Sequence, residues 1–463
     1  MLIPLGFSLF YGESDYVAFA ISIGISIVPG LLLWRLTSVG EGRLSRREAI
    51  MIVAGGWVLA SAFGAIPYIL AGTFQSYLNA YFEAMSGFST TGATVLASIE
   101  SQPHGILLWR SLTQWLGGMG IITLFVALFP MLGIGGAHLI EAEVPGPEAE
   151  RLTARIRDTA KALWFLYFGF SALAFISLWL AKMPVFDALT VTFSTMPTGG
   201  FTPTTLSIGA YNSPLIEGIV ILFMVIAGVN FGLFYFLLWK RQPGRLFRNS
   251  EFRLYIALLV GACLFIALNL LNSSGLSVGE AFRYSSFQVV STMTTTGFVT
   301  TDFNAWPAFA RSALLILMVI GASAGSTGGA LKVIRLLVLF KYAYRRILLF
   351  FNPRAVIPVK VGGNILSERI VSAIIGMSIL YFAILIAGFL VMSALGLDQV
   401  TAISSVAATL GNIGPGLGLV GPTANYLWIP AAGKIVLIIC MLVGRLELFT
   451  VLALLTPSFW KWR

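Results

Sequence analysis

The sequence predicts an all-α protein that crosses a membrane several times, and two observations support this fold class. Of the 463 residues, 57% are hydrophobic and only 10% are charged, whereas soluble domains carry about 25% charged residues. A helix needs about 20 apolar residues to span a bilayer. The chain gathers its apolar residues into long runs, at 16–34, 49–72, 106–134, 162–181, 215–239, 254–272, 312–322, 331–351, 370–397 and 431–457.

The distribution of charge predicts how the chain is oriented. The formal net charge is +10, and most Lys and Arg residues are concentrated in clusters. Cytoplasmic loops carry an excess of Lys and Arg, so we expect these clusters and the C-terminus in the cytoplasm. The excess of positive charge therefore indicates how the chain is oriented in the membrane, and not a surface that binds nucleic acid. The clusters lie at 35–47, 151–161, 240–253, 332–369 and 461–463.

The N-terminal segment is expected on the opposite side of the membrane. The run 16–34 leads into a basic cluster, which places residues 1–15 outside. Residues 1–10 are apolar but too short to span, and no cleavable signal pattern is evident. We expect that an upstream spanning helix is shortened or absent.

Residue types that carry enzyme chemistry are few. Cys263 and Cys440 lie in apolar runs and show no CxxC spacing, while His104 and His138 are far apart in the sequence. The chain has no Walker loop, no GxGxxG after a strand and no Ser/His/Asp arrangement. We therefore expect neither an enzyme nor an organic cofactor.

Short glycine turns recur along the chain at intervals of about 100 residues, as an internal repeat would place them. They contain Gly92, Gly200, Gly297 and Gly414. Before these glycines stand NAYFEAMSGFSTT, DALTVTFSTMPTG, YSSFQVVSTMTTT and TAISSVAATLGNI. Each stretch corresponds to about 20 Å of helix, which enters a bilayer without crossing it. We expect four pseudo-symmetric units, each with a long helix, a half-length helix, a glycine turn and a second long helix.

These units divide the chain. An N-terminal transmembrane segment comes first, the second unit begins with a cytoplasmic linker, and the third contains an interrupted helix. The predicted boundaries are 1–48, 49–140, 141–245, 246–360 and 361–463.

The chemistry of the turns predicts a central ion pore. Irregular backbone at membrane depth is tolerated only where it is buried in protein or lines water. Glycine permits positive φ, and a ring of carbonyl oxygens can replace the water around a dehydrated cation. Each half-helix would aim its partly negative C-terminal end at the same axis. Thr and Ser before the glycines could add hydroxyl oxygens.

Several specific motifs are distributed along the chain. They are FEAMSGFSTTGATVL (82–96), QWLGGMGI (114–121), FPMLGIGG (129–136), FSTMPTGGF (193–201), STMTTTGF (291–298), GASAGSTGGALKVIR (321–335) and GRLELF (444–449). With these motifs nearly the whole chain, from about residue 16, resembles the Trk/Ktr/HKT superfamily of potassium transporters, most closely its Trk type. The resemblance implies four membrane–pore–membrane units, a homodimer with one pore per subunit, and a place in the cell's inner membrane.

The resemblance also implies a filter that binds K⁺. The fourth unit departs from the Thr-rich pattern of the others. Sodium-preferring relatives often carry Ser at the first filter glycine, so a glycine there favours potassium. The filter residues are Thr90, Thr91, Gly92, Thr198, Gly199, Gly200, Thr295, Thr296, Gly297, Asn412, Ile413 and Gly414.

The segment 321–332 predicts a break in a long helix. Its glycines each destabilise a helix by about 1 kcal/mol relative to Ala. Small residues could instead mark a kink at a close helix crossing; the functional alternative is a flexible loop below the filter. The resemblance implies that the loop gates the pore, through Gly325, Ser326, Thr327, Gly328, Gly329 and Lys332.

Arg445 lies inside the last apolar run, where charges are rare. Glu447 is two residues away and faces another side of a helix, so we expect Arg445 to point toward the pore and Glu447 to pair elsewhere. A structural ion pair or a clamp on carbonyls is the alternative. The resemblance implies an electrostatic barrier below the filter. Glu83, within the first half-helix, is expected to hold the filter's scaffold or to attract cations.

The leading prediction is potassium uptake; the alternative is a secondary transporter, a symporter that couples K⁺ to H⁺ or Na⁺. Coupled carriers usually have inverted halves, whereas these units share one orientation. The linker 141–164, with 240–253 and 350–368, is either simply solvated or a docking face. The resemblance implies a cytosolic nucleotide-binding regulatory subunit of the TrkA type as partner. Membrane lipid should surround the chain, and no nucleic acid is expected.

Overall fold

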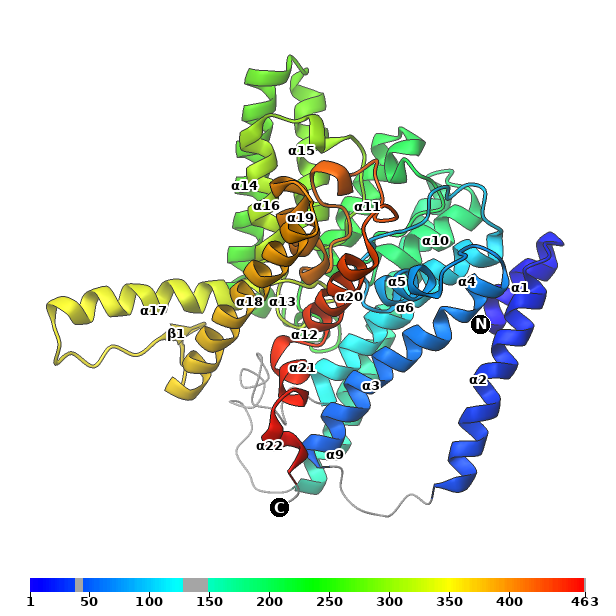
Figure 1. The fold of residues 1–463 in the computed structure, drawn as a ribbon. Coiled ribbons are helices and arrows are strands. Elements are labelled where there is room, and N and C mark those ends of the chain that lie inside the picture. Colours follow the sequence, from blue (N-terminus) through cyan, green and yellow to red (C-terminus); the bar gives the residue numbers. More distant parts are fainter. Residues whose placement is uncertain (38–44, 128–148, 462–463) are drawn as a thin grey trace.

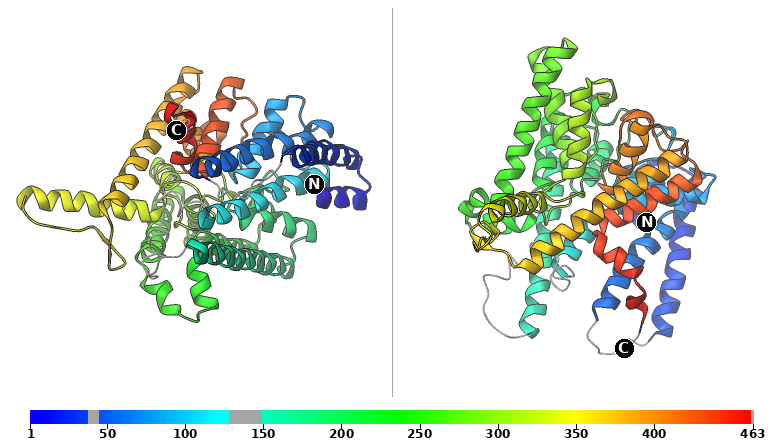
Figure 2. Two further views of the ribbon diagram at one scale, coloured as in Figure 1. Left: turned by 90° about the horizontal axis from the view of Figure 1, so that it is seen from below. Right: turned by 60° about the vertical axis from the view of Figure 1, so that its left-hand side comes forward.

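The computed structural model describes residues 1–37, 45–127 and 149–461 (Figure 1). The sequence motif at 129–136 and the first part of the linker, 141–148, lie outside these ranges. The described residues fold into helices that pack around a common centre, and successive parts of the chain follow one another around it (Figure 2).

Several helices are long and apolar enough to cross a membrane. Five spans meet this criterion in the described residues, or up to seven if each of two bent helix pairs counts as one span. The five comprise α2 (Tyr16–Leu36), α3 (Arg46–Gly64) with α4 (Ile66–Leu70), the apolar part of α9 (Ala149–Leu180), α14 (Ser250–Ser274) and α18 (Glu368–Ala394).

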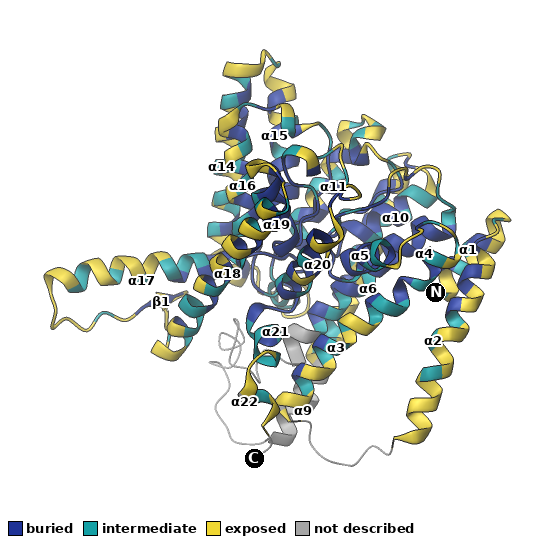
Figure 3. Ribbon diagram, in the orientation of Figure 1, coloured by how far each residue is buried: buried dark blue, intermediate teal, exposed yellow. Residues whose placement is uncertain are grey.

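Four shorter helices precede the glycine turns and are largely buried (Figure 3). Polar caps begin two of them. In α15, Ser277 donates from its N–H (3.0 Å) and hydroxyl (2.7 Å) to Glu280, and these bonds lower the pKa of the Glu280 carboxyl. In α19, Asp398 accepts a hydrogen bond from Thr401 N–H at 3.1 Å. These half-helices are α5 (Tyr77–Phe88), α10 (Val185–Thr195), α15 (Val278–Met293) and α19 (Gln399–Leu410).

The helices after the turns are broken in three of the four units. Only α6 (His104–Ala127) runs on unbroken in the described residues. The pair α11 (Pro214–Ala227) and α12 (Phe231–Leu238) bends by 96°, and α20 (Ala431–Arg445) and α21 (Leu448–Leu454) by 119°. Between α16 (Ala308–Ile320) and α17 (Val333–Phe351) lies the loop 321–332.

The apolar runs 215–239 and 431–457 are therefore not single straight helices, and the prediction of one long second helix in these two units was wrong. Local caps explain the breaks. Asn230 begins α12 by accepting a hydrogen bond from Gly232 N–H at 2.8 Å. Glu447 has a positive φ of 58°, which ends the preceding helix. Apolar composition alone does not show such breaks.

The remaining elements are short. One two-stranded hairpin, in which Lys360 pairs with Ile365, is the exception to the all-α prediction in the described chain. Together with α17 it projects from one side of the helix assembly (Figures 1 and 2). These elements are α1 (Leu2–Tyr11), η1 (Ser207–Tyr211), α13 (Pro243–Arg248), η2 (Phe303–Ala305), β1 (Lys360–Val361), β2 (Asn364–Ile365), η3 (Gly418–Val420) and α22 (Pro457–Trp460).

Burial follows the pattern expected of a membrane protein. The outer helices expose apolar side chains, such as Leu31, Leu32 and Trp34 of α2, where lipid would surround them. The interior instead holds many buried hydroxyl groups, concentrated at the ends of the half-helices. Buried polar groups need hydrogen-bond partners, so the interior requires a specific arrangement of donors and acceptors.

We predict that Gly117→Ala destabilises the fold. A Cβ on Gly117 would collide with the carbonyl oxygen of Phe88 and lie 2.9 Å from its carbonyl carbon, at the end of α5. Backbone atoms cannot move away as a side chain can, so we expect a loss of at least about 1–3 kcal/mol. Thermal melting of the purified protein in detergent measures the effect.

Gly169→Ala in α9 is the matched control, because nothing lies within 4 Å of a Cβ at that position. Alanine favours a helix by about 1 kcal/mol over glycine, so its melting temperature should stay the same or rise. Equal melting temperatures for Gly117→Ala and the unaltered protein would contradict the packing described.

Candidate functional site

The four glycine turns share one unusual backbone geometry. The turn glycines have positive φ: Gly92 (80°), Gly200 (86°), Gly297 (79°) and Gly414 (98°). So do the residues two positions earlier, none of which is glycine: Thr90 (54°), Thr198 (57°), Thr295 (61°) and Asn412 (54°). Such angles are uncommon for non-glycine residues. Their recurrence at matching positions indicates one local structure formed four times.

Each turn begins as the C-terminal cap of its half-helix. In the first turn, Thr90 N–H donates to the Gly87 carbonyl at 2.9 Å, and Thr91 N–H donates to the Ser86 carbonyl at 2.8 Å. This pair of bonds is the Schellman motif, which places one residue in the left-handed conformation. The last carbonyls of each half-helix therefore orient the turn. The matching pairs are Thr198 to Thr195 and Gly199 to Ser194, Thr295 to Thr292 and Thr296 to Ser291, and Asn412 to Thr409 and Ile413 to Ala408.

The four turns contact one another in a closed cycle. Since real Cβ atoms essentially never approach other atoms so closely, only glycine fits at each position in this backbone. A Cβ on each turn glycine would collide with the residue that precedes the glycine of the next turn: Gly92 with the carbonyl oxygen of Gly199, Gly200 with that of Thr296, Gly297 with that of Ile413, and Gly414 with that of Thr91. The chain thus brings all four predicted glycines into one ring, which we call the glycine ring.

Most hydroxyl groups of the turns form hydrogen bonds with other protein groups. Thr91 Oγ1 lies 2.7 Å from Ser89 Oγ, and Thr296 Oγ1 lies 2.8 Å from Thr294 Oγ1. The hydroxyls of Thr91 and Thr296 are therefore each engaged with a second hydroxyl, and their contribution to an ion site stays a prediction. A buried hydroxyl takes a partner wherever one is near, and in the described chain only the Thr90 hydroxyl among the turn threonines has none.

The fourth turn uses Asn412 to reach its neighbours. Asn412 Nδ2 donates to Thr91 Oγ1 at 2.9 Å and to the Met441 carbonyl at 3.0 Å. Tyr426 adds a hydrogen bond from its hydroxyl to the Gly414 carbonyl at 2.7 Å. An amide has two donors where a hydroxyl has one, which gives a physical reason for the departure from threonine. Asn412 thereby closes the cycle between the last turn and the first.

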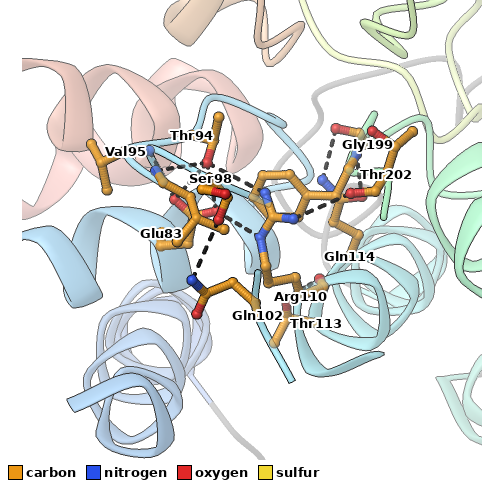
Figure 4. A network of polar contacts seen from close by, with 12 residues as sticks. Glu83, Thr94, Val95, Ser98, Gln102, Arg110, Thr113, Gln114, Gly199 and Thr202 are labelled. Carbon is orange, nitrogen blue, oxygen red and sulfur yellow. Dashed lines mark hydrogen bonds and ion pairs between the residues drawn. The ribbon is translucent and has the colours of Figure 1, made fainter. Parts of the chain in front are cut away.

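A buried ion pair supports the first two turns (Figure 4). Arg110 Nε lies 2.8 Å from Glu83 Oε1, and both side chains are almost fully buried. Glu83 also accepts hydrogen bonds from Val95 N–H (2.9 Å) and the Thr94 hydroxyl (2.9 Å). Arg110 also donates to the Thr202 carbonyl at 3.3 Å. Removing one partner would leave an uncompensated buried charge, so the pair fixes the backbone after both turns.

Glu83 therefore holds the scaffold, which was one of the two roles expected for it. Sequence reasoning did not single out Arg110, although a charge inside the apolar run 106–134 is a signal by itself. A cavity of about 100 Å³ lies on this side of the glycine ring. Its walls include Arg110, the segments that follow the turns and all four turn glycines, Gly92, Gly200, Gly297 and Gly414.

The loop 321–332 lies on the other side of the ring, against the half-helix ends. Gly329 N–H donates to Thr295 Oγ1 at 2.7 Å, and a Cβ on Gly329 would collide with the Gly411 carbonyl. Thr327 is fully buried, and its hydroxyl donates to the Met196 carbonyl at 3.0 Å. The loop therefore touches the second, third and fourth units at once.

Other loop residues bond α12 or one another. The Gly325 carbonyl accepts from Phe231 N–H at 3.0 Å, and the Ser326 hydroxyl donates to Ser323 within the loop. Lys332 Nζ donates to the Gly328 carbonyl. Of the predicted loop residues, only Thr327, Gly328 and Gly329 reach the turns or the half-helix ends.

Arg445 fastens the loop to its surroundings. Its Nη1 donates to the Thr327 carbonyl at 2.6 Å, and its Nη2 donates to the Gly117 carbonyl of α6 at 3.4 Å. Glu447 instead pairs with Arg335 at 2.7 Å, so it does not neutralise Arg445. The buried guanidinium therefore has carbonyl partners, and the structure places its positive charge beside the loop.

Glu251, which sequence reasoning missed, joins both ends of the loop. Its Oε1 accepts from Ala324 N–H (2.6 Å) and Ile334 N–H (3.2 Å). The only sequence signal is an acid just before the apolar run 254–272. In the described residues, no group of three or more His, Cys, Asp or Glu side chains could hold a metal ion.

Comparisons with known proteins identify the family. The family model described as "TrkH: Cation transport protein" matches residues 16–461. The chain is 40% identical over 468 residues to the "Trk system potassium uptake protein TrkH" of Salmonella typhimurium, covering 100% of this chain and 96% of that protein. It is 33% identical over 463 residues to the "Trk system potassium uptake protein TrkG" of Escherichia coli, covering 100% and 95%.

The fold has a close counterpart among solved structures. The crystal structure of "the Potassium Transporter TrkH from Vibrio parahaemolyticus" superposes with a TM-score of 0.92 at 38% identity, over 99% of this chain and 96% of that one. This match confirms the predicted all-α polytopic membrane fold. The descriptions denote transporters and not enzymes. With a family model over nearly its whole length and full-length relatives at 40% identity, the chain belongs to the TrkH family of cation transport proteins.

Proposed function

We propose that this chain takes up potassium ions across the cell's inner membrane, with the glycine ring as its selectivity filter. The observation that carries the proposal is the closed cycle in which each turn glycine lies against a carbonyl oxygen of the next turn. A ring of carbonyl oxygens suits a dehydrated monovalent cation. The names of the relatives, which are potassium uptake proteins, support K⁺ as the ion.

The residues of the four turns would bind K⁺ through backbone carbonyls more than through side chains. The hydroxyls of Thr91 and Thr296 are engaged elsewhere, whereas main-chain oxygens line the contacts between turns. Glycine at position 92 favours K⁺ over Na⁺. The cavity beyond the ring would be the outer entrance, where an arriving ion exchanges its water for carbonyls.

The loop 321–332 and Arg445 would form the gate. The loop packs below the ring, and the buried Arg445 charge lies against its Thr327 carbonyl. A positive charge in a low-dielectric path repels a cation strongly. Opening then requires the loop to leave Thr295 and Arg445 to release it. Arg445 would then have two roles: it bonds the Thr327 carbonyl of the loop, and its charge repels cations.

Passive flux is better supported than coupled transport. A proton-coupled carrier needs a titratable carboxylate in the path. Of the buried acids next to the turns and the loop, Glu83 pairs with Arg110 and Glu447 with Arg335, and Glu251 accepts two backbone hydrogen bonds. These groups are engaged in structural contacts.

The proposal includes the assembly. We expect a homodimer with cytoplasmic C-termini and a cytosolic nucleotide-binding regulatory subunit of the TrkA type, which would open the gate from below. The names of the relatives, which refer to a Trk system, support a partner in general terms. The basic segments 240–253 and 350–368 would face that partner.

Ion flux into liposomes that contain only this chain tests the function. With a K⁺ gradient and no pH or Na⁺ gradient, we expect K⁺ uptake that exceeds Na⁺ uptake. Gly297→Ser should abolish this preference or the flux, because a Cβ at that position collides with the Ile413 carbonyl. Gly218→Ala is the control, since nothing lies within 4 Å of its Cβ. Flux that appears only with a proton or sodium gradient would favour the symporter.

Arg445→Ala tests the gate. Removing the charge and the bond to the Thr327 carbonyl should raise K⁺ flux about tenfold, which corresponds to about 1.4 kcal/mol of barrier. Arg253→Ala, which removes an exposed charge at the cytoplasmic start of α14, should leave the flux unchanged. Unchanged or reduced flux in Arg445→Ala, at equal amounts of folded protein in the liposomes, would contradict the barrier.

A further inference from the structure

The second turn differs from the others in the residue before its glycine. Gly199 stands where the other turns carry Thr91, Thr296 and Ile413. The missing side chain is replaced from another helix, because Gln114 of α6 fills the space. A Cβ on Gly199 would collide with the Gln114 amide carbon and lie 2.8 Å from Gln114 Nε2. Gln114 is fully buried.

Gln114 makes hydrogen bonds on both sides of Gly200 (Figure 4). Its Nε2 donates to the Gly199 carbonyl at 2.7 Å, and its Oε1 accepts from Phe201 N–H at 3.1 Å. A side-chain amide has donors on one atom and an acceptor on the other, so this pair of partners fixes its orientation. The Gln114 amide therefore links the backbone before and after Gly200.

The second turn lacks the support that the first and third turns carry themselves. There, the threonine before the glycine pairs with a hydroxyl two residues earlier, Ser89 or Thr294. In the second turn that earlier position is Pro197, which has no hydroxyl. Gln114 thus provides the side-chain hydrogen bonds that the residues of the second turn do not provide themselves.

The carbonyl that Gln114 holds belongs to the ring. The Gly199 oxygen is the one against which Gly92 packs. In the described residues, no protein donor bonds the equivalent carbonyls of Thr91, Thr296 and Ile413. Gln114 therefore restrains one of four otherwise free oxygens, at the contact between the first and second turns.

The helix face that carries Gln114 is held in place by Arg110. Arg110 lies one helical turn before Gln114 on α6, so both side chains are on one face. Arg110 bonds the Thr202 carbonyl and pairs with Glu83 of the first half-helix. Gln114 belongs to the first unit and the second turn to the second unit. Gln114 thus orients the second turn relative to the first unit.

We propose that Gln114 is a positioning residue that sets the ion preference of the filter by holding the Gly199 carbonyl. This rests on the proposed function of the glycine ring. The Gln114 side chain does not bind the ion. It limits how far the second turn can rotate or contract, and with it how well the ring fits an ion smaller than K⁺.

Gln114→Leu tests the proposal, since leucine has a similar size and makes no hydrogen bond. In liposomes or planar bilayers with mixed K⁺ and Na⁺ solutions, we expect the K⁺/Na⁺ permeability ratio to fall about fivefold to tenfold, as loss of a hydrogen bond at an ion site allows. K⁺ flux should persist. Gln102→Leu is the matched control, because the Gln102 side chain donates hydrogen bonds to Ser98 and Ser101 just before α6, away from the turns.

The outcomes separate this proposal from the proposed function. An unchanged permeability ratio in Gln114→Leu, with K⁺ flux intact, overturns the role of Gln114. An equal loss of K⁺ and Na⁺ flux with a lower melting temperature also overturns it, since that is a structural effect alone. An unaltered protein that shows no preference for K⁺ overturns the proposed function instead.

A double-variant cycle keeps the test decisive if Gln114→Leu does not fold. Gly199→Ala alone should lower the permeability ratio, because its methyl group displaces the Gln114 amide. Gln114→Ala alone should lower it as well. Combining the two should lower the ratio little further, since both remove the same interaction. Effects that simply multiply would overturn the proposal.

Discussion

The contact between each turn glycine and a carbonyl oxygen of the neighbouring turn is the constraint on which the rest of the structure depends. It requires glycine at four positions, left-handed backbone two residues before each, and half-helices that end in matching caps. No single unit can meet these requirements alone, because each glycine packs against another unit. The ring thus couples segments more than 300 residues apart, as the bond from Asn412 to Thr91 illustrates.

Buried charged side chains hold the backbone on both sides of the ring. The buried pair of Glu83 and Arg110 fixes the backbone beyond the first two turns, beside the cavity. Below the ring, Arg445 fastens the loop through the Thr327 carbonyl. Both devices use buried charge, which is stable only with partners in place. The difference is that Arg110 is neutralised by a carboxylate, whereas Arg445 is held by carbonyls and keeps its positive charge beside the proposed path.

The fold class and the four turns could be predicted from the sequence because they depend on local properties, namely the length of apolar runs and the spacing of glycines. The breaks near Asn230 and Glu447 could not, since apolar composition is the same on both sides of each bend. Nor could the roles of Gln114 and Glu251, whose partners lie 85 and 73 residues away. The hydroxyls of Thr91 and Thr296 are a different case, because their partners Ser89 and Thr294 lie only two residues away; which group a buried hydroxyl bonds depends on the conformation of the folded turn.

The most direct test of the central claim is to locate the ion. Anomalous scattering from crystals of this protein grown with Rb⁺ or Tl⁺, which replace K⁺, would show where a monovalent cation binds. The account predicts a peak within the glycine ring, coordinated by main-chain oxygens of all four turns. No peak in the ring, with density instead beside carboxylates such as Glu251 or Glu447, would contradict it.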